Sequence, residues 1–127
     1  MDGEMTNLES LRSLQKRIRE ATGPDRNLDW DIREAFYPGR MGQAPLFTLD
    51  PDGIGPCVAL MRAALPGWLF DLRQQHKEDW QARVHRRCLK RTPHDDVFAS
   101  HRLSTHATLL AIVSALIAQE EAKEKAG

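Results

Sequence analysis

The sequence is poor in cysteine and has no excess of either charge. Its 127 residues contain two cysteines, Cys57 and Cys88, without a CxxC spacing. This pattern is not typical of a metal or redox motif, and we expect both thiols to stay reduced inside a cell. The 18 basic and 18 acidic side chains cancel, which excludes a strong overall field toward nucleic acid or anionic lipid. An electrostatic partner would have to meet a local patch.

Long apolar runs and targeting signals are also missing. The longest apolar stretch, residues 109–118, is interrupted by Ser114 and is shorter than the roughly 20 apolar residues of a membrane span. The N-terminus lacks the basic region and apolar segment of a secretory signal. We therefore expect a protein of the cytoplasm without membrane association.

Internal repeats and low-complexity segments are absent, and the length predicts one domain. The polar residues 1–5 are expected to be disordered, and the natural start could be Met1 or Met5. The folded domain is predicted over residues 6–118. Residues 119–127 carry several charges and are expected to form a frayed tail.

Helical signals dominate the first half of the chain. Thr6 and Glu9 have the spacing of a capping box, which predicts a helix start. An apolar stripe at intervals of three and four continues to Ile18, and Gly23 is predicted to be a left-handed C-cap. A second amphipathic helix is predicted over residues 25–37.

A glycine- and proline-containing loop is predicted over residues 39–48. The loop is expected to dip into the core through Leu46, Phe47 and Leu49. The next helix begins at the Asp50-Pro51 pair or nearer to Gly55, and it ends at the Pro66-Gly67 pair.

Residues 66–91 change from helical to strand periodicity. Two runs of alternating apolar side chains flank a polar turn at residues 74–79, a pattern typical of a half-buried hairpin. The side chains of its apolar face are Trp68, Phe70, Leu72, Trp80, Ala82 and Val84. The two tryptophans are predicted to face each other across the hairpin. Residues 92–102 are predicted to be a polar connection, anchored by Val97 and Phe98.

The last helix, capped by Ser104 or Thr105, is apolar over more than half of its circumference and must be buried on two sides. The predicted order is helix, helix, helix, strand, strand, helix. This order is typical of an α+β fold with about four helices on one face of a small antiparallel hairpin. Because a two-stranded hairpin leaves edges that another copy can pair with, a homodimer that extends the sheet is also expected.

A basic segment at residues 83–91 is the strongest charge feature. Its candidate partner-binding side chains are Arg83, Arg86, Arg87, Lys90 and Arg91. Arginines that alternate out of a strand stand about 7 Å apart, close to the phosphate spacing along one nucleic-acid strand. The same charges are typical of a solvated strand edge that resists aggregation. The second interpretation is favoured, because the chain is neutral and has no recognised nucleic-acid motif.

The chain has the side-chain types of a metal site without the usual spacing. The side chains concerned are Cys88, His94, Asp95, Asp96, His101 and His106. His101 and His106 are five residues apart, which on a helix points them away from each other. Cys88 and His85, three apart on a strand, point to opposite faces and cannot form a thiol–base pair. We therefore predict no metal, no cofactor, no catalytic residue and no enzymatic activity.

Trp30 is the best single candidate for a protein contact. It falls off the apolar face of its predicted helix and is flanked by Asp29 and Asp31. Protein interfaces are enriched in tryptophan anchors. The alternative is that Trp30 packs under the loop at residues 39–48.

Three stretches of the chain have to be taken together. They are ATGPDRNLDWDI at residues 21–32, LFTLDPDGIGPCVALMRAALPGWLFDL at residues 46–72 and THATLLAIVSALIA at residues 105–118. Together they resemble a family of small proteins encoded by phages and prophages of proteobacteria. In this family a TGPDR-type turn, an aromatic-threonine segment before a helix, a PxGW-like hairpin entry and an alanine/leucine-rich last helix occur in this order. The family has no assigned activity, so the resemblance implies no catalytic residues. This sequence departs from the family pattern at residues 83–91 and 92–102, where its own function is expected to lie.

The resemblance implies a context for the function. Small neutral phage proteins without catalytic signatures often bind a host or phage protein, and inhibitors of bacterial defence such as anti-CRISPR proteins are one such group. We therefore expect an accessory protein that acts by protein–protein interaction in the cytoplasm of a bacterial host. The alternative is a nucleic-acid-binding accessory protein that uses residues 83–91.

Overall fold

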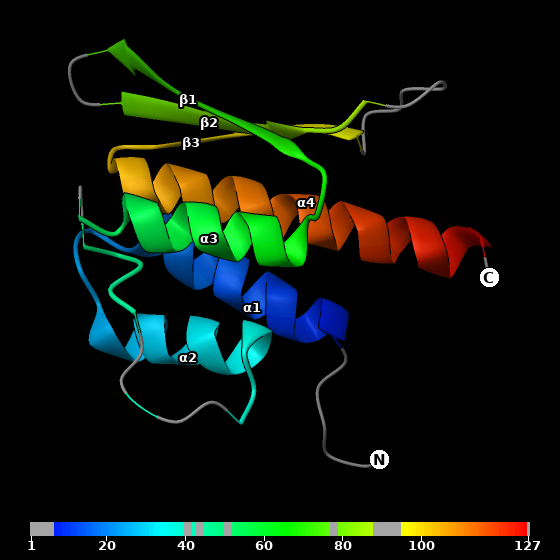
Figure 1. Cartoon of the computed structure of the whole chain (residues 1–127), viewed down its shortest axis with the longest axis horizontal. Helices are drawn as coiled ribbons and strands as arrows, with labels where there is room; N and C mark the ends of the chain where they lie inside the picture. Colours follow the sequence, from blue (N-terminus) through cyan, green and yellow to red (C-terminus); the bar gives the residue numbers. More distant parts are fainter. Residues whose placement is uncertain are drawn as a thin grey trace.

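A computed structural model describes residues 7–39, 42, 45–49, 52–76, 79–87 and 95–126. These residues form an α+β fold, as predicted from the sequence. The elements are α1 (Asn7–Glu20), α2 (Arg26–Phe36), α3 (Ile54–Ala64), β1 (Leu69–His76), β2 (Asp79–His85), β3 (Asp96–His101) and α4 (Ser104–Ala126). The three-stranded sheet lies on one side of a stack of helices, with α4 and α3 nearest to it and α2 farthest away (Figure 1).

The hairpin predicted from the alternating pattern is present, with a tighter turn. β1 ends at His76 and β2 begins at Asp79, so only residues 77–78 separate the strands. The sequence predicted a turn over residues 74–79, because the last three residues of β1, Gln74, Gln75 and His76, are polar and do not continue its apolar alternation. Strand pairing is antiparallel throughout.

The register of the hairpin separates the two tryptophans that were predicted to face each other. Trp68 precedes β1, whereas Trp80 pairs with Gln74 near the other end of that strand. The predicted Trp68–Trp80 pair is therefore wrong, because the short turn brings the start of β2 opposite the end of β1. Trp68 is buried in the core instead, and the Arg86 guanidinium lies 5.3 Å from its ring centroid.

A third strand replaces the polar connection predicted over residues 92–102. β3 pairs with β2, so that β2 is the central strand. Val97 and Ala99 pack against the core, while Phe98 and Ser100 are exposed on the opposite side. The prediction was wrong because a strand with one solvated face and polar ends has the composition of a loop. Its period of two was the available signal.

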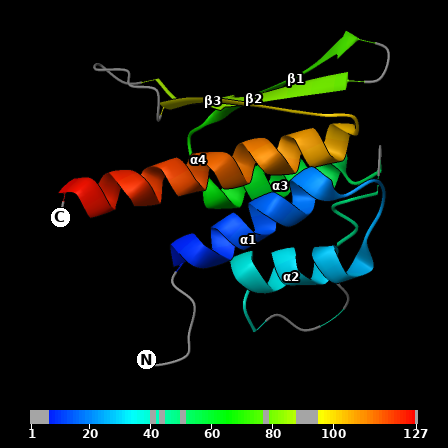
Figure 2. The ribbon, with the colours of Figure 1, turned by 180° about the vertical axis from the view of Figure 1, so that it is seen from behind.

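α4 is buried on two sides, as its composition predicted. It packs against β2 and β3 on one side and against α1 and α3 on the other (Figures 1 and 2). The helix extends through Ala126, beyond the predicted end at residue 118. Arg12 of α1 forms a 2.8 Å ion pair with Glu121, so part of the predicted frayed tail is helical and contacts the domain.

The first two helices differ from the sequence prediction at their ends. α1 ends at Glu20, and the glycines with positive φ among the described residues are Gly39, Gly42 and Gly67. Gly23 is therefore not the left-handed C-cap that was predicted; it lies too far beyond the helix end. Asp25 is the N-cap of α2, where its carboxylate accepts hydrogen bonds from two backbone N–H groups. The predicted capping box falls on Thr6, outside the described residues.

The segment at residues 45–49 is anchored to the start of α2. The Thr48 backbone N–H donates to the Asp29 carboxylate at 2.9 Å, and the Asp25 N–H donates to Thr48 Oγ1 at 2.8 Å. Asp29 is buried, and burial raises the pKa of its carboxyl, while the hydrogen bonds from Thr48 act in the opposite direction. Phe47 is buried as predicted, but Leu46 is exposed.

α3 begins next to this segment. The helix starts at Ile54, with Gly53 as its N-cap residue, while the predicted Asp50-Pro51 start lies outside the described residues. The Gly53 N–H donates to the Leu49 carbonyl. The Cys57 side chain is buried in the core and lies 3.3 Å from the Phe47 carbonyl oxygen.

His101 joins three elements at one end of the fold. Its Nε2 lies 3.1 Å from the Ala21 carbonyl oxygen, and its Nδ1 accepts a hydrogen bond from the Leu103 N–H. These two contacts fit a neutral imidazole with the proton on Nε2. Burial lowers the pKa of His101, which also favours the neutral ring.

The described helices include none that is long and apolar enough to cross a membrane.

Gly53→Ala tests the close contact between residues 45–49 and α3. A Cβ at this position would lie 2.3 Å from the Leu46 carbonyl oxygen and 2.5 Å from that of Phe47. The backbone would have to move, so we expect a loss of about 1–3 kcal/mol in the free energy of unfolding. The control is Gly55→Ala, whose Cβ would meet nothing within 4 Å, and which we expect to be neutral or stabilising by up to about 1 kcal/mol. Equal urea midpoints for the two variants would contradict the contact.

His101 predicts a pH dependence of stability. Its folded-state pKa is lowered from 6.5, so the unfolded chain takes up the proton more readily. Its contribution to stability is therefore complete above pH 6.5 and is lost as the pH falls through the folded-state value. In His101→Gln the amide can still donate to the Ala21 carbonyl but does not titrate. Urea unfolding should show a smaller loss on acidification for the variant than for the wild type.

Candidate functional site

Among the residues that the structure describes, the helices leave one face of the sheet uncovered. All four helices lie on the side of Ala82 and Val84, which are fully buried (Figures 1 and 2). We call the opposite side the outer face. It is formed by Leu69, Asp71, Arg73, Gln81, Arg83, His85, Asp96, Phe98 and Ser100, which stand in register across the three strands. At its centre, Asp71, Arg83 and Phe98 form one row.

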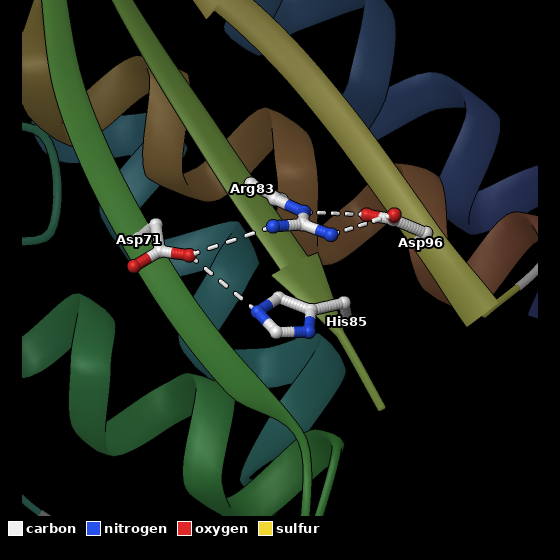
Figure 3. Close-up of polar contacts among 4 residues, drawn as sticks. All are labelled: Asp71, Arg83, His85 and Asp96. Atoms are coloured by element: carbon white, nitrogen blue, oxygen red, sulfur yellow. Dashed lines mark hydrogen bonds and ion pairs between the residues drawn. The ribbon is translucent and has the colours of Figure 1, made fainter. Parts of the chain in front are cut away.

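Arg83 is held by carboxylates from both neighbouring strands. Its Nε and Nη2 donate to the two oxygens of Asp96 at 2.7 and 2.8 Å, a bidentate arrangement. Asp71 lies 3.9 Å away on the other side and is also 3.4 Å from Nε2 of His85 (Figure 3). The guanidinium is thus fixed in position, and its charge is largely compensated within the sheet.

Two large apolar side chains are exposed on the same face. Phe98 is 53% exposed and Leu69 is 45% exposed. The Arg83 guanidinium lies 5.3 Å from the centroid of the Phe98 ring. This is a cation–π contact between the two side chains. A depression of about 310 Å³ on this face is lined by Asp71, Arg73, Gln81, Arg83 and Phe98. The outer face therefore combines an aromatic side chain, a fixed arginine and charges of both signs.

The structure divides the predicted basic segment. Arg83 lies on the outer face, whereas Arg86 turns toward the buried Asp95, with its Nε 2.5 Å from Oδ1, and covers Trp68. Arg87 is exposed. Lys90 and Arg91 lie outside the described residues. Arg83 and Arg86 are therefore both paired with aspartates. They do not form the row of exposed arginines that would bind successive phosphates.

Trp30 lies far from this face. It is on α2, at the opposite end of the helix stack from the sheet (Figure 1), and is 48% exposed. The buried Arg33 has its guanidinium 5.0 Å from the indole centroid. The structure therefore does not bring Trp30 and Arg83 into one surface, and the two are separate candidates for partner binding.

The prediction that His101 and His106 point away from each other is wrong. His101 ends β3 and His106 is in α4, and their rings stack with centroids 4.8 Å apart. They were expected to point apart from their spacing of five residues on a helix, but His101 lies on a strand and the chain turns between the two residues. His94 and Cys88 lie outside the described residues, so the prediction that Cys88 and His85 form no thiol–base pair is not tested. Among the described residues, no group of three or more ligand-type side chains could hold a metal ion.

The sequence did not identify the apolar part of the outer face. Phe98 was assigned to a connection as an anchor, and Leu69 was not among the side chains of the predicted apolar face. The alternation along residues 96–101 could have identified Phe98, because it places Phe98 on the same face as Arg83 once a third strand is recognised.

The chain matches no protein-family model, no curated protein and no solved structure.

Arg86→Ala distinguishes a structural arginine from a partner-binding one. The substitution removes the ion pair with buried Asp95 and the cover over Trp68. We expect a loss of about 1–3 kcal/mol in the free energy of unfolding, the scale of hydrogen bonds to charged groups. Arg87→Ala is the control because Arg87 is exposed, and it should change stability by less than about 0.5 kcal/mol. Equal thermal midpoints for the two variants would show that the pair with Asp95 adds nothing.

Proposed function

We propose that this protein acts by binding another protein through the outer face of its sheet, rather than by catalysis. The observation that carries the proposal is the exposed Phe98 ring beside the fixed Arg83 guanidinium, at the centre of a sheet face without helices. Aromatic and arginine side chains are the commonest anchors of protein interfaces. Fixing Arg83 in advance reduces the entropy lost on binding.

The charges of this face favour a protein partner over nucleic acid. Arg83 is bound bidentately by Asp96 and is close to Asp71. A phosphate would have to displace one carboxylate and approach the other. An apolar side chain such as Leu69 also offers nothing to a phosphate backbone. A protein surface with charges of both signs and an apolar centre fits the outer face better.

The resemblance to small phage proteins supports a more specific proposal. It implies a host or phage protein as the partner, in the cytoplasm of a bacterial host. Inhibition of a bacterial defence system, as by anti-CRISPR proteins, is one form such binding takes. Binding of nucleic acid through residues 83–91 is the alternative, and a homodimer that extends the sheet is a separate proposal.

Phe98→Ala tests the proposed face. Phe98 projects into solvent from an edge strand, so its removal should leave the fold intact. Removal of an interface anchor weakens binding by at least about 2 kcal/mol, roughly thirtyfold. Affinity purification of tagged wild-type protein from its host identifies the partner. Calorimetric titration of that purified partner with each variant then measures the affinity.

Trp30→Ala is the matched control, since Trp30 is comparably exposed at the other end of the molecule. We expect it to bind like the wild type. Full binding by Phe98→Ala together with loss of binding by Trp30→Ala would indicate that the interface is on α2 instead. Recovery that depends on nucleic acid, and is abolished by nuclease, would favour the alternative function.

A further inference from the structure

β1 is an outer edge of the sheet that is suited to pairing. The strand order gives β1 a neighbouring strand on one side only, among the residues the structure describes. Its sequence, LFDLRQQH, contains neither proline nor lysine, two residues that commonly protect strand edges. Its apolar side chains are incompletely covered: Leu69 is 45% exposed, and Phe70 and Leu72 are only partly buried.

We propose that a second copy of this protein pairs with β1, antiparallel, about a two-fold axis at Leu72. The pairing joins two sheets edge to edge and places the helices of both copies on the same side. It uses the edge of the sheet and does not depend on the protein partner proposed above.

The charges of β1 select this register. When two copies pair with their helices on the same side, residues of the same face stand opposite each other, so the axis passes through a residue. An axis at Asp71 would place Asp71 opposite itself, and an axis at Arg73 would place two arginines together. An axis at Leu72 places Asp71 opposite Arg73 of the partner subunit, and does so twice. An axis at Phe70 would leave few residues of β1 to pair, because β1 begins at Leu69 and the pairing would extend beyond the start of the strand.

The surroundings of Asp71 leave room for this contact. Its side chain is 60% exposed, although it already faces Arg83 and His85 on β2 (Figure 3). Arg73 of the partner subunit would approach from the open side of β1. Charges would then alternate across the outer face in the order Asp96, Arg83, Asp71 and Arg73 of the partner subunit. Opposite charges directly across a strand pair stabilise the pairing, and like charges destabilise it.

The other edge of the sheet offers no equivalent pairing. In β3, the charged Asp96 is already bound by Arg83. A symmetric pairing about Phe98 would place Asp96 opposite Ser100, with no gain of charge. Pairing of β1 with β3 of another copy would be head-to-tail and would not close. A closed dimer through β1 is therefore the arrangement that the charges favour.

The test uses two charge reversals, Asp71→Arg and Arg73→Asp. In the first variant both residues are arginine, and in the second both are aspartate, so each homodimer has two like-charged pairs in place of two opposite ones. In an equimolar mixture, each heterodimer regains two opposite pairs. Sedimentation equilibrium over a concentration series measures dimer formation, and native mass spectrometry distinguishes heterodimers from homodimers.

We expect a concentration-dependent dimer for the wild type, because a single strand edge buries less than a standard interface. Each variant alone should dimerise roughly tenfold more weakly, and the mixture should regain the wild-type affinity as a heterodimer. A wild type that stays monomeric over the whole series would overturn the proposal. Variants that dimerise like the wild type, or a mixture without heterodimers, would also overturn it.

A cysteine cross-link tests the register even if a charge reversal impairs folding. In a chain with Cys88→Ser, oxidation of Leu72→Cys should give a covalent dimer. Cα atoms directly opposite are about 4.5–5.5 Å apart, within the range a disulfide spans. Leu69→Cys is the control, since its copies would stand far apart along the strands. A cross-link at residue 69 without one at residue 72 would contradict the register.

Discussion

The burial of α4 is the constraint on which the rest of the structure depends. Its first ten residues are all buried, and its side chains are apolar on nearly every side. Such a helix is stable in water only when other elements cover it from more than one direction. The inner face of the sheet covers one side, and α1 and α3 cover the other. The inner face of the sheet therefore forms one side of the hydrophobic core.

The outer face follows from this arrangement. Because α4 needs only one face of the sheet, the small apolar residues Ala82 and Val84 point inward, and the alternate positions of the strands are left to solvent. Polar residues alone at these outward-facing positions would be enough to keep the protein soluble. The presence of Phe98 and Leu69 at these positions, beside a bidentate pair that holds Arg83, is not required by the fold. These two apolar side chains support the proposal that the outer face binds a partner.

The parts of the fold with strong periodicity could be predicted from the sequence. The four helices, the burial of α4 and the alternating faces of the hairpin all follow from apolar spacing. The third strand could not, because residues 96–101 have polar ends and only two inward apolar side chains, Val97 and Ala99. The predicted pairing of Trp68 with Trp80 was wrong for a different reason. Strand periodicity shows which face of the sheet a residue is on, but the residue opposite it depends on the length of the turn.

The candidate site was found only in part, for related reasons. The sequence identified Arg83 and Arg86 as charges and Trp30 as a partly exposed side chain. Arg83 lies on the outer face and Trp30 is exposed, whereas Arg86 turns toward the buried Asp95. Which carboxylates neutralise the arginines depends on strand pairing, so Asp96 and Asp95 could not be assigned in advance. For the same reason, Phe98 could not be placed beside Arg83.

Hydroxyl-radical footprinting of the protein, alone and bound to its partner, tests the outer face most directly. Phe98, Leu69 and Trp30 are similarly exposed in the free protein, so all three should be oxidised readily. On binding, Phe98 and Leu69 should lose most of their reactivity while Trp30 keeps its own. Protection of Trp30 with unchanged oxidation of Phe98 would contradict the assignment of binding to the outer face.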